Sequence, residues 1–141
     1  MITRSYFLIL LTPSPISASA ADIVGRASVI DGDTLEIAST RIRLAGIEAP
    51  EASQLCRGQD SLHYRCGAKA ANDLDAMLKD RVVTCSTSGR SYDRVVATCT
   101  VDDTDISAWM VKQGLALDWP KYSKGRYAAD QQAAERGERG M

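Results

Sequence analysis

The chain has 141 residues, 45% of them hydrophobic, so it can fill one core and does not require a second domain. Its formal net charge is −1, which argues against the basic overall surface of proteins that bind nucleic acid tightly and nonspecifically. A local basic cleft is compatible with this balance, because four arginines could converge: Arg41, Arg43, Arg90 and Arg94.

The first 20 residues have the pattern of a secretory signal peptide. Arg4 supplies a positive charge, residues 6–11 are apolar, and Ala18-Ser19-Ala20 fits an A-x-A cleavage site. The alternative is a membrane anchor, but a span needs about 20 apolar residues, and this shorter block is followed by two prolines. We predict a signal peptide over residues 1–20 and a domain over residues 21–141. The mature protein would be secreted or periplasmic, without membrane contact.

Strands are predicted first. Residues 27–37 read as two strands around an Asp-Gly turn, because apolar residues flank the turn and alternate after it. Residues 41–47 form the next strand, in which Ile42 and Leu44 share one face and the arginines share the other. We expect Arg43 to point away from the core.

The remaining elements follow a polar loop at residues 51–64. Helical spacing of apolar residues predicts a helix over residues 67–79, and an antiparallel strand pair is predicted at 82–85 and 94–101 with a loop between them. Two further helices are predicted, one capped by Thr104 and ended by Gly114, the other capped by Ser123. Strands with helices inserted between and after them indicate a small α+β domain.

The cysteine pattern predicts disulfides. The chain has one histidine, His63, and no C-x-x-C pair, so a zinc site is disfavoured. Export makes disulfides the expected state, and four cysteines allow three pairings. We favour the two pairings that close short segments, Cys56–Cys66 and Cys85–Cys99.

Three runs carry a resemblance to a known family: Ile30-Asp31-Gly32-Asp33-Thr34, the segment from Arg41 to Glu51, and Tyr92-Asp93-Arg94-Val95-Val96-Ala97. Together they resemble the staphylococcal nuclease-like (thermonuclease) family, over residues from about Val24 to the C-terminus. The resemblance implies a five-stranded barrel of the oligonucleotide/oligosaccharide-binding type, the OB-fold, with three helices. It also implies roles for individual residues.

A calcium site is the first implied feature. The resemblance assigns the metal to the carboxylates of Asp33 and Glu48 and to the backbone carbonyl of Ala49, with Asp31 close by. Carboxylate and carbonyl oxygens suit this hard cation. Glu48 departs from the aspartate of the family pattern, and calcium's flexible coordination can absorb the longer side chain. Taken alone, the Asp-Gly-Asp run could be only a hairpin turn.

Phosphodiester chemistry is the second implied feature. The resemblance makes Arg43 and Arg94 phosphate-binding arginines, which suits the negative charge that develops during hydrolysis. It makes Glu51 the general base or the residue that orients the attacking water. Without the resemblance, both arginines could be solvated strand residues and Glu51 could be a first-turn acid after Pro50.

Tyr92 and Tyr122 match family aromatics that line the nucleotide pocket, although each could instead pack at the barrel rim. Trp119 could stack on a base or pack in the core. Arg90 and Asp93 depart from the family loop, where an aspartate and a glycine are usual. The resemblance implies a monomeric, calcium-dependent, sugar-nonspecific endonuclease acting on single-stranded DNA and RNA and leaving 3′-phosphate ends. The alternative is a non-catalytic OB-fold module with a degenerate site.

Overall fold

The computed structural model describes residues 7–15, 22–137 and 139–140. Residues 7–15 form neither helix nor strand, and their apolar side chains are exposed. The predicted cleavage site lies outside the described residues, so the signal peptide stays a prediction. No helix in the described part of the chain is long and apolar enough to cross a membrane.

A seven-stranded sheet forms one side of the domain. Six strands follow the order β1-β8-β9-β4-β3-β2, and β10 pairs with β9. All pairings are antiparallel except that between β4 and β9. The strands are β1 (Ile23–Gly25), β2 (Ser28–Asp31), β3 (Thr34–Ile37), β4 (Thr40–Leu44), β8 (Val83–Ser91), β9 (Arg94–Val101) and β10 (Thr104–Asp105).

The sheet has the strand arrangement of an OB-fold, a partly open five-stranded barrel. The two ends of the sheet path, β1 and β2, are separated in sequence by Arg26 and Ala27 alone. They act as two halves of one bent barrel strand, since β1 pairs with β8 and β2 pairs with β3. In the described residues no ladder joins β1 to β2, so chain continuity, not hydrogen bonding, links these ends.

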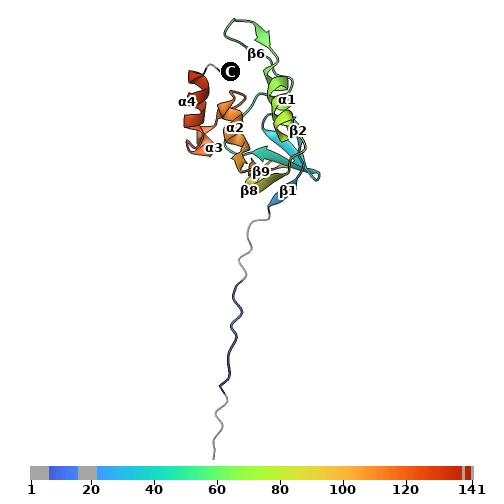
Figure 1. The fold of residues 1–141 in the computed structure, drawn as a ribbon, viewed down its shortest axis with the longest axis vertical. Coiled ribbons are helices and arrows are strands. Elements are labelled where there is room, and N and C mark those ends of the chain that lie inside the picture. Colours follow the sequence, from blue (N-terminus) through green and yellow to red (C-terminus); the bar gives the residue numbers. More distant parts are fainter. Residues whose placement is uncertain (1–6, 16–21, 138, 141) are drawn as a thin grey trace, which may run out of the picture.

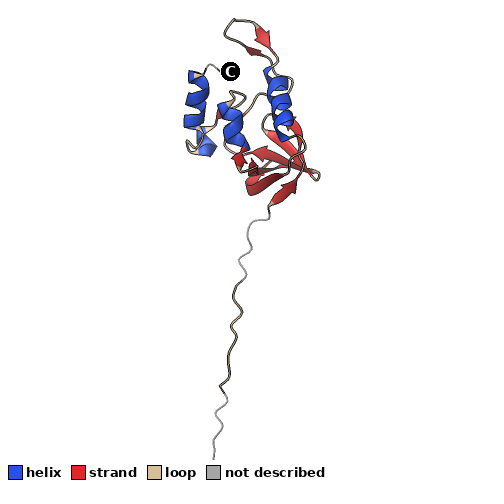
Figure 2. Ribbon diagram, viewed as in Figure 1, coloured by secondary structure: helices blue, strands red, loops and turns tan. Residues whose placement is uncertain are grey.

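Four helices lie on one side of the sheet (Figures 1 and 2). Helix α1 lies nearest β2, α3 and α4 lie at the opposite side of the molecule, and α2 lies between them. Two short ribbons complete the fold: β5 (Ile47–Glu48) with β11 (Leu117–Asp118), and β6 (Cys56–Arg57) with β7 (His63–Tyr64). The helices are α1 (Cys66–Leu78), α2 (Ile106–Lys112), α3 (Pro120–Ser123) and α4 (Ala128–Arg136).

The core lies between the sheet and the helices. Ile42 and Leu44 are fully buried while Arg43 between them is only partly buried, which confirms the predicted alternation of this strand. On α1, Ala70, Leu74 and Leu78 recur every four residues and face the same core. Burying one such leucine stabilises the fold by about 1.5–3 kcal/mol.

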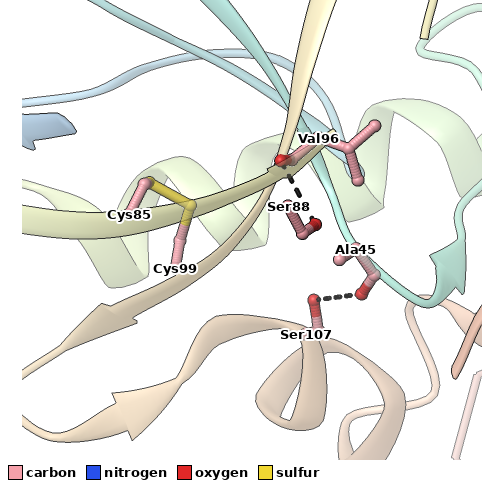
Figure 3. The surroundings of a disulfide bond; sticks show 6 residues. All are labelled: Ala45, Cys85, Ser88, Val96, Cys99 and Ser107. Carbon is pink, nitrogen blue, oxygen red and sulfur yellow. Dashed lines mark hydrogen bonds between the residues drawn. A yellow bond between two sulfur atoms is a disulfide. The ribbon is translucent and has the colours of Figure 1, made fainter. Parts of the chain in front are cut away.

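Both predicted disulfides are present, Cys56–Cys66 and Cys85–Cys99. The second joins directly opposed residues of β8 and β9 and is fully buried (Figure 3). The first ties the β6–β7 ribbon to the start of α1.

Three boundaries differ from the sequence predictions. The expected loop at residues 86–93 is wrong, because β8 continues to Ser91 and only a two-residue turn remains. Asp105, not Thr104, caps α2, with its Oδ1 accepting a hydrogen bond from the backbone N–H of Ala108 at 3.3 Å. Ser123 ends α3 instead of capping the last helix. The predicted last helix therefore begins later, at Ala128, and the short helix α3 precedes it.

Candidate active site

A cleft of about 520 Å³ opens between the end of the β8–β9 hairpin, the β4–β5 connection and the segment around α3. It brings together four residues that the sequence singled out as catalytic or substrate-binding: Arg43, Tyr92, Arg94 and Tyr122. Arg90 and Trp119 line the same cleft, together with Leu44, Ala45, Gly46, Ser88, Gly89, Ser91 and Val96.

The two predicted phosphate-binding arginines are anchored on one carboxylate. Nη1 of Arg43 lies 3.4 Å from Oδ2 of Asp33, and each side chain is only 12% exposed. Nη1 of Arg94 donates to Oγ1 of Thr34 at 3.2 Å, and that hydroxyl donates to Oδ1 of Asp33 at 3.0 Å. Sequence reasoning missed Thr34 as the link, although it directly follows Asp33. The network fixes two guanidinium groups at one end of the cleft.

One backbone contact joins the two segments that carry the predicted metal-binding residues. The backbone N–H of Ala49 donates to Oδ2 of Asp33 at 3.1 Å, which brings the Glu48-Ala49 segment next to the aspartate. Gly32 permits this approach, because a Cβ there would lie 2.9 Å from the Cβ of Ala49. The Glu48 side chain is exposed at the end of β5.

The donor set suits calcium in chemistry. Each carboxylate oxygen of Asp33 keeps acceptor capacity beyond its hydrogen bond, and Glu48 and the carbonyl of Ala49 add oxygen ligands. Arg43 pairs with Asp33 and would compete with a cation for this carboxylate. Among the described residues there is no preformed group of three or more His, Cys, Asp or Glu side chains arranged for a metal.

Glu51 lies outside the residues that line the cleft, with its side chain exposed. Its backbone is held on two sides. The N–H of the next residue, Ala52, donates to Oδ1 of Asp31 at 2.8 Å. On the other side Gly67 of α1 packs so closely that a Cβ there would overlap the carbonyl oxygen of Glu51 at 1.6 Å. The position of Glu51 thus depends on Asp31 and on the first turn of α1.

Aromatic rings form the rim of the cleft. Trp119 and Tyr122 make an edge-to-face pair with centroids 4.4 Å apart, and the guanidinium of Arg43 lies 5.2 Å from the Trp119 ring centroid. Tyr92 is 96% exposed at the β8–β9 turn, with a φ of +57°. Trp119 is partly buried and lines the cleft, and its stacking on a base stays a prediction.

The wall that carries Trp119 is fastened to the β4–β5 connection. The N–H of Trp119 donates to the carbonyl of Gly46 at 2.9 Å, and the buried Ser107 of α2 donates to the carbonyl of Ala45 at 3.1 Å (Figure 3). Gly46 has a φ of +77°, and a Cβ there would lie 3.0 Å from the Tyr127 ring. Only glycine fits both the backbone conformation and the contact.

A partly buried hydrogen bond holds Tyr127, whose ring lies against Gly46. The hydroxyl of Tyr127 donates to Oδ2 of Asp105 at 2.8 Å, and Nη2 of Arg126 lies 3.4 Å from the same oxygen. Burial, followed by the hydrogen bond to the Asp105 carboxylate, raises the pKa of Tyr127 to about 12. Tyr127 is therefore a neutral hydrogen-bond donor at physiological pH.

Comparison with known proteins places these residues in a family. Residues 41–141 match the family described as staphylococcal nuclease homologue. The chain belongs to this family. It is 43% identical over 122 residues to the succinoglycan biosynthesis protein ExoI of Rhizobium meliloti (strain 1021), covering 84% of this chain and 64% of that protein. It is 32% identical over 101 residues to an uncharacterized endonuclease of Haemophilus influenzae (strain ATCC 51907 / DSM 11121 / KW20 / Rd), covering 67% and 51% respectively. The chain thus spans about half to two thirds of these curated relatives.

In this staphylococcal nuclease homologue the family match begins at Arg41, after Asp33. The structure nevertheless joins Asp33 to the matched region through Ala49, Arg43 and the Thr34–Arg94 link. Three residues that depart from the family pattern are exposed: Glu48, Arg90 and Asp93.

Proposed function

We propose that this protein is a calcium-dependent, sugar-nonspecific endonuclease that hydrolyses phosphodiester bonds of single-stranded DNA and RNA and leaves 3′-phosphate ends. The observation that carries the proposal is the anchoring of two guanidinium groups on Asp33 beside an aromatic cleft. Family membership supports it, as does the similarity to a protein named as an endonuclease.

Arg43 and Arg94 would bind the nonbridging oxygens of the scissile phosphate. Hydrolysis builds negative charge on these oxygens, and guanidinium groups fixed before the reaction stabilise that charge without reorganising. Thr34 holds Arg94 in place, and the ring of Trp119 supports Arg43. Removing either arginine therefore acts mainly on the chemical step.

Glu51 would orient the attacking water and accept its proton. The effect of Glu51 depends on its placement, and Asp31 and α1 determine the position of its backbone. Asp33, Glu48 and the carbonyl of Ala49 would hold the calcium ion. When bound, calcium polarises the phosphate and lowers the pKa of a coordinated water.

The aromatic rim supports binding without selection among bases. Tyr92, Trp119 and Tyr122 offer ring surfaces on which any base can stack, and stacking does not depend on base identity. Single strands expose their base faces and duplexes do not. We infer a preference for single-stranded or frayed substrates, a monomeric protein and, from the two disulfides, a secreted or periplasmic site of action.

The deciding experiment is hydrolysis of denatured DNA with calcium, with and without a chelator. We expect cleavage that the chelator abolishes. Because the products would carry 3′-phosphates, a polymerase should extend their 3′ ends only after phosphatase treatment. Asp33→Asn is the matched inactive variant, because it keeps side-chain volume and removes the charge. Failure of the wild type to cleave DNA or RNA with any divalent cation would exclude the enzyme.

The second candidate function is a binding module without catalysis. The observation in its favour is the Arg43–Asp33 ion pair, since Arg43 occupies the carboxylate that a cation requires, while Glu48 replaces the usual aspartate. Tight binding of single strands without cleavage, unaffected by calcium, would support this function instead.

A further inference from the structure

A second hollow lies next to the cleft. It measures about 680 Å³ and is lined by Glu36, Ser39, Thr40, Arg41, Arg90, Asp93 and Val95. One residue lines both the hollow and the cleft, namely Arg90 near the end of β8. The two concave surfaces therefore share Arg90 as a common wall.

The charge of the cleft differs from that of the whole chain. Its lining contains Arg43, Arg90 and Arg94 and no acidic residue, whereas the chain has a net charge of −1. Among the described residues Arg90 forms no ion pair, in contrast to Arg43, which pairs with Asp33. Arg90 is exposed, so its charge is available to a phosphate of a strand that extends out of the cleft.

The second hollow is not uniformly basic. Arg41 lies 4.0 Å from Glu36, with both side chains about half exposed, and Asp93 adds a second carboxylate. Two carboxylates disfavour a phosphate deep in this hollow. The two carboxylates can accept hydrogen bonds from exocyclic amino groups of bases. The hollow therefore suits the bases of a strand, and the phosphate would bind to Arg90.

We propose that Arg90 binds a phosphate next to the scissile one and leads a single strand from the cleft into the second hollow. This inference rests on the proposed function and specifies the substrate class. Strands of several nucleotides would be preferred over dinucleotide diesters. Arg90 is then a specificity-determining residue, distinct from Arg43 and Arg94.

Binding tests the proposal without hydrolysis. The affinity of the protein for a fluorescent 12-nucleotide single strand is measured in chelator over a range of salt concentrations. Each phosphate contact on a single strand contributes about 0.7 to the slope of log affinity against log salt. We expect Arg90→Ala to reduce the slope by about this amount. Arg57→Ala is the control, because Arg57 is an exposed arginine that lines neither hollow.

Kinetics supply the second readout. Arg90→Ala should raise KM for the oligonucleotide about tenfold more than KM for a dinucleotide diester, with kcat on the oligonucleotide changed less than KM. Arg90→Lys should restore part of the salt slope, since the charge remains.

An unchanged salt slope, or wild-type protein that binds no single strand, would overturn the proposal. So would equal losses on the two substrates. If the wild type binds strands but cleaves none, the enzyme is excluded, while the salt slope still decides the role of Arg90.

Discussion

Asp33 is the residue on which the candidate site converges. Its carboxylate accepts hydrogen bonds from Thr34 and Ala49 and pairs with Arg43, at 8% exposure of the residue. Charged hydrogen bonds in such a poorly hydrated place are stronger than those at the surface. One short side chain thereby orients Arg43, the proposed phosphate-binding arginine, and the backbone of Ala49, the proposed metal ligand.

The arginines provide the sharpest test at this scale. We expect Arg43→Ala and Arg94→Ala each to lower kcat about a hundredfold or more, the scale reached when one preorganised charge-stabilising donor is removed. KM should change much less. Steady-state kinetics on denatured DNA measures both, and wild-type turnover by Arg94→Ala would disprove the phosphate role. Because Asp93 lies beside Arg94, Asp93→Gly should raise activity.

Asp31 separates a positioning role from a metal-binding role. Asp31→Asn keeps an oxygen that can accept the N–H of Ala52, whereas Asp31→Ala does not. We expect kcat near the wild-type value for Asp31→Asn and about a tenfold loss for Asp31→Ala, since Glu51 loses one of its two backbone supports. Equal losses, accompanied by a higher calcium requirement, would instead make the Asp31 charge part of the metal site.

At the scale of elements, sequence pattern predicted what alternation or helical spacing encodes. The buried faces of β4 and α1 follow from their apolar periods. The second half of β8 was missed because Ser86, Ser88 and Arg90 are exposed and Gly89 sits at a register shift, so the apolar signal of a strand is absent there. Asp105 was missed as a cap because Thr104, directly before it, is also a favoured capping residue.

The contact between α2 and the segment before α4 makes a prediction about pH. Tyr127 is a donor to Asp105, and its pKa of about 12 lies above the ordinary 10, so the folded state favours the protonated form. This contribution is complete below pH 10 and is lost as pH rises toward 12, because the unfolded chain ionises first. Between pH 9 and 11 the free energy of unfolding should fall by about 1 kcal/mol from this group.

Urea denaturation at several pH values measures this loss. Tyr127→Phe should be less stable at pH 7 by about 1 kcal/mol and should lack that part of the alkaline decline. Tyr92→Phe is the control, because Tyr92 is 96% exposed and should follow the wild type. Identical pH profiles for Tyr127→Phe and wild type would show that the hydrogen bond does not control ionisation.

At the scale of the whole molecule, the family resemblance predicted the OB-fold, the cleft and four of its residues, which periodicity alone could not name. The links that complete the site join residues far apart in sequence. Arg94 bonds to Thr34, which is 60 residues away in sequence. The register of the β8–β9 hairpin places Arg90 at the cleft. Such contacts depend on how sheet strands align in space, which a single sequence does not specify.

The two disulfides differ in their accessibility to reductant. Cys85–Cys99 is fully buried, whereas Cys56 is partly exposed, so mild reductant should open Cys56–Cys66 first. The loss of this bond should destabilise the fold by about 2–3 kcal/mol and lower kcat about tenfold, because Cys66 begins the helix that supports Glu51. Thiol mapping and activity during a dithiothreitol titration test this order. A Cys56→Ser/Cys66→Ser double variant with wild-type kcat would contradict the link to activity.

If the protein is the exported nuclease proposed above, the Cys56–Cys66 bond would make its activity depend on the compartment in which the bond forms. Cytosolic thiols keep such a pair reduced, so a chain still inside the cell would carry a loosely held Glu51 beside the genome it could degrade. Oxidation after export would recover the roughly tenfold loss of kcat expected for the reduced chain. Formation of the bond would thus confine full activity to the space outside the cytoplasm.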